Sequence, residues 1–460
     1  MSGSGPEASA PAYVRTANLP FLSSLPVDRP LARVDLAGSI AHVEMLGASG
    51  LLTAQETAQL VRGLRAVARE VADGSFPWRP ELEDVHTNVE VRLTELVGPV
   101  GGKLHTARSR NDQIAVDERL FLRAAIGASA DRLAALARTL LERAAETVEV
   151  PMPGYTHLQR AQTVSVAHWL LAHFWRLDRD LDRLLATAHR ADVSPLGAGA
   201  LAGSTLPIDP AASARRLGFE RVFENSMDAV SDRDAIAELL FDLALVAVHA
   251  SSLGEEIVLY ASSEFGFLER TEALGAGSSL MPQKRNPDLA ELARGKTGRV
   301  VGDLVALLTV LKGLPLTYNR DLQEDKAPLL DAVETVGSVV EVLSALLGSV
   351  RFDMSKLRAA AADPGLLATD RAERLVAAGA PFREAHERIA REYASVGSAT
   401  AAGEPSQALA ARATPGAPAP DRVVEQLARA RASLAARRAS LSSLERKVER
   451  IEELLNEAKP

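Results

Sequence analysis

The sequence predicts an all-α protein whose central part is a bundle of long helices. Ala and Leu, both strong helix formers, dominate the chain from about residue 28 onward. Only 4% of the 460 residues are aromatic, and no alternating run typical of a strand extends beyond a few residues. Apolar residues recur instead with helical spacing over long segments. A chain of this length exceeds one compact core and indicates about two to four domains.

The predicted helices follow one another in chain order. Two or three short helices are expected over 28–73 and another over 81–98. Long helices are expected at 112–148, from just after MPGYTH (152–157) to about 190, at 231–264, at 286–312 and at 325–350. Asn286 is the expected N-cap of the fourth long helix, because Pro287 suits the first helical position.

The helix predicted at 231–264 is apolar over most of its circumference. A helix of roughly 30 residues spans roughly 45 Å. One chain offers too little apolar surface to bury it, so the pattern predicts a homo-oligomer built around an elongated helical core. A membrane span is not expected, because no apolar run reaches about 18 uncharged residues.

The C-terminal region combines a linker with a heptad-like segment. Residues 404–421 are rich in Pro and Ala and predict a linker. Beyond it, leucine or valine recurs every seven residues, at Leu427, Leu434, Leu441, Val448 and Leu455, with Leu444 and Ile451 between. Arg437 interrupts the second stripe. Two arrangements fit this pattern: self-association as a coiled coil, or an amphipathic helix lying on its own subunit.

Composition narrows the class of function. The formal net charge is -8, so the chain has no bulk positive field that would attract nucleic acid or an anionic membrane. It has no cysteine, which removes disulfides, thiolate nucleophiles and cysteine-ligated metals. The start, MSGSGPEASAPAY, lacks the basic and apolar parts of a signal peptide and is expected to be a disordered tail. These features are compatible with a cytoplasmic protein.

Four polar segments interrupt the apolar helices: HTARSRNDQ (105–113), GYTHLQRAQ (154–162), GAGSSLMPQKRNPDLAE (275–291) and YNRDLQEDK (318–326). Each lies where a long helix begins or ends. Because a bundle brings such ends together in space, we expect these segments to form the functional site.

Single residues within these segments also have simpler explanations. A histidine such as His157 is more often a structural hydrogen-bonding residue than a catalytic one, although Thr156 beside it offers a donor. Glu291 near a helix start is usually a favourable partner of the helix dipole, and it assists catalysis only if it contacts an imidazole. Ser278 becomes reactive only if Gly275 and Gly277 let its loop close on a substrate.

The cations in these segments favour an anionic substrate. The triplet Ser109, Arg110 and Asn111 combines a guanidinium fork with fixed donors, which suits a carboxylate. Lys284 and Lys326 add two more cations, so a di- or tricarboxylate substrate is expected. Neither GxxxxGK[ST] nor GxGxxG after a strand occurs, so a nucleotide cofactor lacks support. His, Asp and Glu do not show recognisable metal-ligand spacing.

Together the motifs resemble the fumarase/aspartase superfamily and, within it, the argininosuccinate lyase family. GSSLMPQKRNPDLAE is similar to the superfamily's loop. The segments that favour this family are DLAGSIAHVEML (35–46), EDVHTNVEVRL (83–93), GGKLHTARSRNDQ (101–113), MPGYTHLQRAQ (152–162), NSMDAVSDRD (225–234) and KGLPLTYNRDLQEDK (312–326). The resemblance covers about 28 to 435. The family's usual Trp-Gly-Gly-Arg-Phe start is missing, and the segment 436–460 continues past the usual end.

The resemblance implies a three-domain helical protein that is active as a homotetramer, with each site assembled from three subunits. It implies reversible cleavage of argininosuccinate to arginine and fumarate in arginine biosynthesis, with no metal and no organic cofactor. Ser278 would be the base and His157 the acid, with Glu291 raising the basicity of His157. Lys284 and Asn286 would stabilise the carbanion.

The substrate would be held by Ser39, Ser109, Arg110, Asn111, Thr156, Tyr318, Gln323 and Lys326. Expected boundaries are a tail at 1–27, an N-terminal helical domain at 28–108, the bundle at 109–360, a small helical domain at 361–435 and a helical extension at 436–460. Two alternatives stay open: another lyase of the superfamily, acting on adenylosuccinate, aspartate or malate, and a non-catalytic homologue of the crystallin type.

Overall fold

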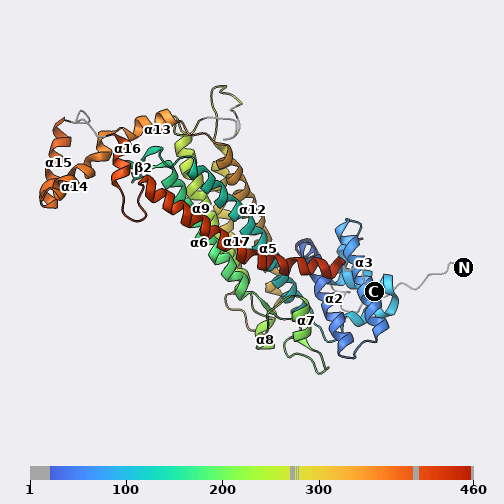
Figure 1. Cartoon of the computed structure of the whole chain (residues 1–460). Coiled ribbons are helices and arrows are strands. Elements are labelled where there is room, and N and C mark those ends of the chain that lie inside the picture. The colour runs from blue at the N-terminus through green and yellow to red at the C-terminus, as the bar shows by residue number, and fades with distance from the viewer. Residues whose placement is uncertain (1–20, 270–274, 276, 278, 397–403, 457–460) are drawn as a thin grey trace.

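The computed structural model describes residues 21–269, 275, 277, 279–396 and 404–456. The molecule is elongated (Figure 1), with a bundle of long helices in the middle. An N-terminal helical group including α2 and α3 lies at one end, and a second group including α14 and α15 lies at the other. The all-α fold class predicted from the sequence is confirmed.

Short helices and 3-10 turns form the N-terminal group. They are α1 (Leu25–Asp28), η2 (Arg29–Leu31), α2 (Ala32–Ala48), α3 (Ala54–Ala72), η3 (Pro80–Leu82), α4 (Val85–Val97) and η4 (Gly98–His105). Capping side chains fix where two of them begin. Thr53 and Glu56 make a capping box at α3, and the Asp84 side chain accepts a hydrogen bond from the Thr87 backbone N–H at the start of α4.

Long helices form the bundle and share one apolar core. They are α5 (Arg110–Ala145), α6 (Val166–Arg190), α9 (Asp234–Ala261), α11 (Thr297–Leu311) and α12 (Lys326–Ser349). Leu133, Phe174, Leu239 and Leu343 are fully or almost fully buried in this core. The connections carry β3 (Val193–Ser194), α7 (Pro210–Arg216), β4 (Arg221–Val222), α8 (Ser226–Ala229), α10 (Asp288–Gly295) and η6 (Arg320–Asp325). Four of the five predicted long helices are therefore present as α5, α6, α9 and α12.

Two details of the prediction were wrong. The helix expected directly after residue 157 is preceded by an antiparallel hairpin, β1 (Pro151–Thr156) and β2 (Gln159–Ser165). Prolines and a glycine break the alternation of β1, which concealed the strand. The segment 286–312 is two helices, α10 and α11, and the N-cap is Pro287 rather than Asn286, with no side-chain cap.

Helix α17 (Pro420–Asn456) answers the question left open for the heptad segment. Figure 1 shows it running along α5 and α6 toward the N-terminal group. Leu427, Leu434 and Leu441 are buried, so the helix lies on its own subunit. Arg437, which interrupts the stripe, pairs with Asp182 on α6. The helix passes without a break through residue 436, where an extension was expected to start.

The distal group consists of α13 (Met354–Ala361), η7 (Pro364–Leu367), α14 (Ala368–Ala377), α15 (Phe382–Val396) and α16 (Pro405–Ala411). Helix α16 lies inside the segment expected to be a linker. The hairpin β1–β2 lies at this end of the bundle, since Tyr155 stacks on Phe265 just beyond α9, with ring centroids 5.4 Å apart.

Apolar side chains remain uncovered on two helices of the bundle. Phe241 and Val248 of α9 and Val305 and Leu308 of α11 are about half exposed. Helix α9 is long and apolar enough to cross a membrane by length and composition. The core helix of a soluble protein has the same length and composition, and α9 packs within the bundle core. These exposed faces are the surface on which the expected oligomer depends.

Candidate active site

A cavity of about 270 Å³ opens where α5 begins. It gathers five residues that the sequence predicted to bind substrate: Arg110, Asn111, Tyr318, Gln323 and Lys326. Two come from the first turn of α5 and three from the segment that runs through η6 into α12. Two of the four polar segments thus meet in space, as expected.

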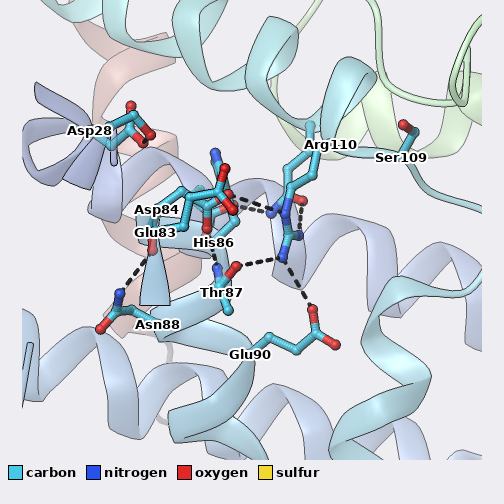
Figure 2. A network of polar contacts seen from close by, with 12 residues as sticks. Asp28, Glu83, Asp84, His86, Thr87, Asn88, Glu90, Ser109 and Arg110 are labelled. Atoms are coloured by element: carbon cyan, nitrogen blue, oxygen red, sulfur yellow. Dashed lines mark hydrogen bonds and ion pairs between the residues drawn. The ribbon is translucent and has the colours of Figure 1, made fainter. Parts of the chain in front are cut away.

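Arg110 is fixed by a fan of acceptors. Its Nη1 donates to the Gln113 Oε1 at 2.8 Å, and its Nη2 lies 3.4 Å from both the Thr87 hydroxyl and a Glu90 carboxylate oxygen. Asp84 adds an ion pair at 3.6 Å. Figure 2 shows Thr87 and Glu90, both on α4, contacting the guanidinium. The side chain is therefore held in one orientation while still lining the cavity.

Lys326 is the buried cation of the cavity. Its Nζ lies 3.2 Å from Asp325 Oδ1 and 3.5 Å from Glu118 Oε1. Burial disfavours the ammonium, but the carboxylates of Asp325 and Glu118 hold the pKa of Lys326 above its ordinary value. The lysine therefore stays charged at neutral pH.

Carboxylates form a second wall that the sequence analysis did not single out. Asp28, Glu83 and Asp84 line the cavity together with Ser24, Thr87, Ile114 and Arg320. Burial raises the pKa of Asp28, although Lys326 opposes the shift. The motif EDVHTNVEVRL contained Glu83, Asp84 and Thr87, but the spacing alone did not show which of its side chains face a cavity.

Two predicted serines lie outside the lining of this cavity. Ser39 is fully buried in α2, and its hydroxyl accepts a hydrogen bond from Arg108 Nη1 at 3.0 Å. Ser109 is the N-cap of α5 and makes a capping box with Asp112. Both support the segment that carries Arg110, whereas Ser24 lines the cavity.

Thr156 and His157 lie at the tip of the β1–β2 hairpin, and both are exposed. The 36 residues of α5 span about 50 Å and separate this tip from Arg110, because the hairpin follows the far end of that helix. The structure does not bring these residues together with the cavity within one chain.

The loop before α10 folds back on itself. Gly277 and Arg285 form an antiparallel bridge, and a Cβ on Gly275 would lie 2.6 Å from the Asn286 carbonyl oxygen. Gly275 is thus required by the close approach of two backbone segments. Lys284 and Glu291 are exposed and Asn286 is half-buried. Ser278 lies outside the described residues.

Comparison with known proteins identifies the family. A family model described as Lyase matches residues 11–302. The argininosuccinate lyase of Symbiobacterium thermophilum is 53% identical over 371 residues, which cover 81% of this chain and 80% of that protein. That of Roseiflexus sp. (strain RS-1) is 50% identical over 434 residues, 89% and 95% of the two chains. The chain belongs to the argininosuccinate lyase family.

Solved structures share the fold of this chain. EDDS lyase in complex with formate matches with a TM-score of 0.84 at 27% identity, over 94% of this chain and 91% of that one. The class II fumarase from Schistosoma mansoni matches with a TM-score of 0.69 at 16% identity, over 86% of this chain and 94% of that one, and shares the fold. As a member of the argininosuccinate lyase family, the chain is a lyase of the fumarase/aspartase-like fold.

In this member of the argininosuccinate lyase family, backbone strain coincides with the motifs. Among the described residues other than glycine, positive φ angles occur at Glu83, Ala107, His157, Leu158 and Thr317. Each lies in or directly beside a segment that carried the family resemblance. A positive φ is rare for such side chains and costs on the order of 1–3 kcal/mol. The surrounding packing therefore holds these segments in conformations that they would not adopt alone.

One buried cluster places possible metal-binding groups together. Asp35, His86 and Asp117 each offer an atom within 4.8 Å of the others. His86 Nδ1 lies 3.0 Å from Asp35 and 3.6 Å from Asp117, and the Arg108 guanidinium faces the same carboxyls. Because Arg108 faces both carboxyls and His86 contacts both, the cluster is best explained as a buried polar network near Arg110.

A larger cavity, of about 640 Å³, lies in the distal group. Its charged walls include Asp370 and Arg412, which pair with each other at 2.7 Å. It contains none of the predicted catalytic or substrate-binding residues. The smaller cavity at α5 is therefore the better candidate, because the residues with matching chemistry converge there.

Proposed function

We propose that the chain is an argininosuccinate lyase of arginine biosynthesis, acting in the cytoplasm as a homotetramer. The reaction is the reversible elimination of argininosuccinate to L-arginine and fumarate. The observation that carries the proposal is the cavity at α5, where cationic side chains, among them Arg110 and Lys326, face a wall of carboxylates. Argininosuccinate has three carboxylates, a guanidinium and an ammonium, so both signs of charge are needed in one site.

The cavity residues would bind and orient the substrate. Arg110 suits a carboxylate because its guanidinium presents paired donors. Lys326 offers a second positive charge, and Asn111, Tyr318 and Gln323 offer neutral donors. Asp28 and Asp84 suit the cationic groups of the arginine part. This arrangement distinguishes argininosuccinate from aspartate or malate, which lack the guanidinium.

The other two segments would supply the chemistry. Ser278 would remove the proton from the succinate carbon, and Lys284 and Asn286 would stabilise the negative charge that flows into the neighbouring carboxylate. His157 would donate a proton to the departing guanidino nitrogen, with Glu291 raising its basicity. The carbon–nitrogen bond breaks as the double bond of fumarate forms. Thr156 would contact the substrate beside His157.

Assembly of several chains would complete the site. Within one chain, α5 keeps the cavity and the hairpin about 50 Å apart. The half-exposed apolar residues of α9 and α11 offer a surface on which helices of other subunits would pack. Packing the bundles side by side in opposite directions would place the hairpin of one chain beside the cavity of another.

The test is to incubate the purified chain with argininosuccinate and follow fumarate by its ultraviolet absorbance. Adenylosuccinate and aspartate run in parallel. If adenylosuccinate or aspartate is turned over and argininosuccinate is not, that compound replaces the proposed substrate. If none of the three compounds is turned over, a crystallin-type homologue is favoured. Ser278→Ala and His157→Asn are each expected to lower turnover by about 100-fold or more. A near-normal rate in either variant would remove that residue from the mechanism.

A further inference from the structure

Four ionisable side chains form a closed group beneath the cavity at α5. Glu118 lies on the third turn of α5, and Arg233 is the N-cap of α9. Asp325 and Lys326 join η6 to α12. Arg233 Nε lies 2.6 Å from Asp325 Oδ2 and 3.0 Å from Glu118 Oε2. No side chain of the four is more than 4% exposed.

Lys326 is the member of this group that reaches the cavity, and Glu118 and Asp325 are its two carboxyl neighbours. Arg233 does not line the cavity but bridges the same two carboxyls. Glu118 and Asp325 thus position the Lys326 ammonium, although neither carboxyl lines the cavity.

The charge of the group determines whether Lys326 attracts a substrate carboxylate. With both carboxyls ionised, two negative and two positive charges offset one another, and Lys326 has little attraction left for an anion. With one proton on the carboxyl pair, the group carries one net positive charge. In a buried site with low polarisability, that single charge has a large effect on binding.

We propose that Glu118 shares a proton with Asp325 and, in that state, positions Lys326 to bind a substrate carboxylate. This inference rests on the proposed function, because it concerns binding in the same cavity. Glu118 is a positioning residue: it acts through Lys326 and does not touch the substrate.

The environment of the two carboxyls supports this assignment. Burial raises the pKa of Glu118 to about 8, with Arg233 opposing the shift and Asp325 adding to it. The pKa of Asp325 is lowered, because Lys326 and Arg233 outweigh its burial. Arg233 Nε contacts both carboxyls, at 3.0 Å for Glu118 and 2.6 Å for Asp325, so the two groups lie side by side. A proton shared between them favours the protonated form of Glu118 and the ionised form of Asp325.

Other titratable groups face this cluster and act on different members of it. Asp117 of α5 lies beside Glu118, and its pKa is raised well above the ordinary value by burial. Asp28 of α1 acts on Lys326, and Tyr318 faces Arg233 and Lys326. The pKa of Tyr318 is also raised by burial. Glu118 differs from these groups in its position, because its Oε1 lies 3.5 Å from Lys326 Nζ and its Oε2 lies 3.0 Å from Arg233 Nε.

The experiment measures kcat and KM for argininosuccinate between pH 7 and pH 9. In the unmodified chain, KM is expected to rise about tenfold over this range, because one proton is lost from the binding-competent state. Glu118→Gln cannot ionise and is expected to flatten this rise in KM. Glu118→Leu should also flatten the rise in KM. Its KM should be several-fold higher at every pH, because Lys326 then contacts one carboxyl, Asp325, instead of two.

The matched control is Glu341→Gln on α12, the helix that Lys326 begins. Glu341 is exposed and pairs with Arg132 at the surface, so the same change of charge should leave the KM profile as in the unmodified chain. Light scattering confirms that each variant assembles, and Glu118→Leu serves if Glu118→Gln does not fold.

If KM still rose about tenfold between pH 7 and pH 9 in Glu118→Gln and Glu118→Leu, as in the unmodified chain, the inference would be overturned. The titrating group would then lie elsewhere. A purely structural role for Glu118 would change stability without altering the pH dependence of KM, and that result would overturn it as well. Absence of fumarate with the unmodified chain would overturn the proposed function itself, and the inference with it.

Discussion

A complementation experiment tests whether the site is shared between chains. One variant, Lys326→Met, damages the cavity at α5, and a second, His157→Asn, damages the hairpin tip. Each variant alone is expected to be nearly inactive. The two are unfolded together in equal amounts, refolded, and assayed for release of fumarate.

The expected magnitude follows from the separation of the two segments. Because α5 spans about 50 Å between them, a complete site needs its cavity from one chain and its hairpin from another. In a random mixture, half of the cavities and half of the hairpins are intact. About one quarter of the sites then carry both, so about 25% of the unmodified activity should return.

A site shared between chains and a site formed within one chain predict different recovered activities. If both segments came from the same chain, every site would contain one damaged residue and mixing would restore nothing. Recovered activity no greater than that of the separate variants would refute the reasoning, provided that light scattering shows mixed assemblies. Each variant refolded alone is the control for residual activity.

Further predictions concern binding, assembly and the C-terminal helix. Arg110→Lys keeps the charge but loses the paired donors, so kcat/KM for argininosuccinate should fall about 10- to 100-fold. Val305→Asp places a charge on the exposed apolar face of α11, and light scattering should show that the assembly dissociates. Val424→Asp on α17 is the control, because Val424 is 55% exposed and Val305 is 56% exposed, and this variant should stay assembled. Leu441→Ala removes a side chain that is only 1% exposed and should cost about 2–5 kcal/mol in urea unfolding; a cost below that of Val424→Ala would contradict the packing of α17.

Much of the fold follows from local sequence. The long helices were predicted because apolar spacing is a local property, and their starts are fixed by nearby side chains such as Ser109 and Asp112. The hairpin was missed because Pro151, Pro153 and Gly154 conceal its alternation. Pairing between β1 and β2, and the contact of Tyr155 with Phe265 beyond α9, stabilise the two strands.

The candidate site divides in the same way. The sequence identified the residue types, because Arg110, Asn111 and Lys326 stand in polar segments at helix ends. It did not identify the acidic wall, since Asp28 and Asp84 are ordinary acids until α1 packs on α12 and α4 contacts Arg110. This packing brings the acids into one cavity with the cations.

By itself, the sequence determined the helical class and the family and named the candidate site residues, because periodicity and motif spacing are local properties of the chain. Tertiary structure alone decided which of them meet. It placed Ser24 in the lining of the cavity and left Ser39 outside it, and it brought Glu118 of α5 and Asp325 of η6 onto the same arginine, Arg233. It also put His157 at the far end of α5, because a rigid helix keeps its two ends apart however closely the sequence motifs follow one another.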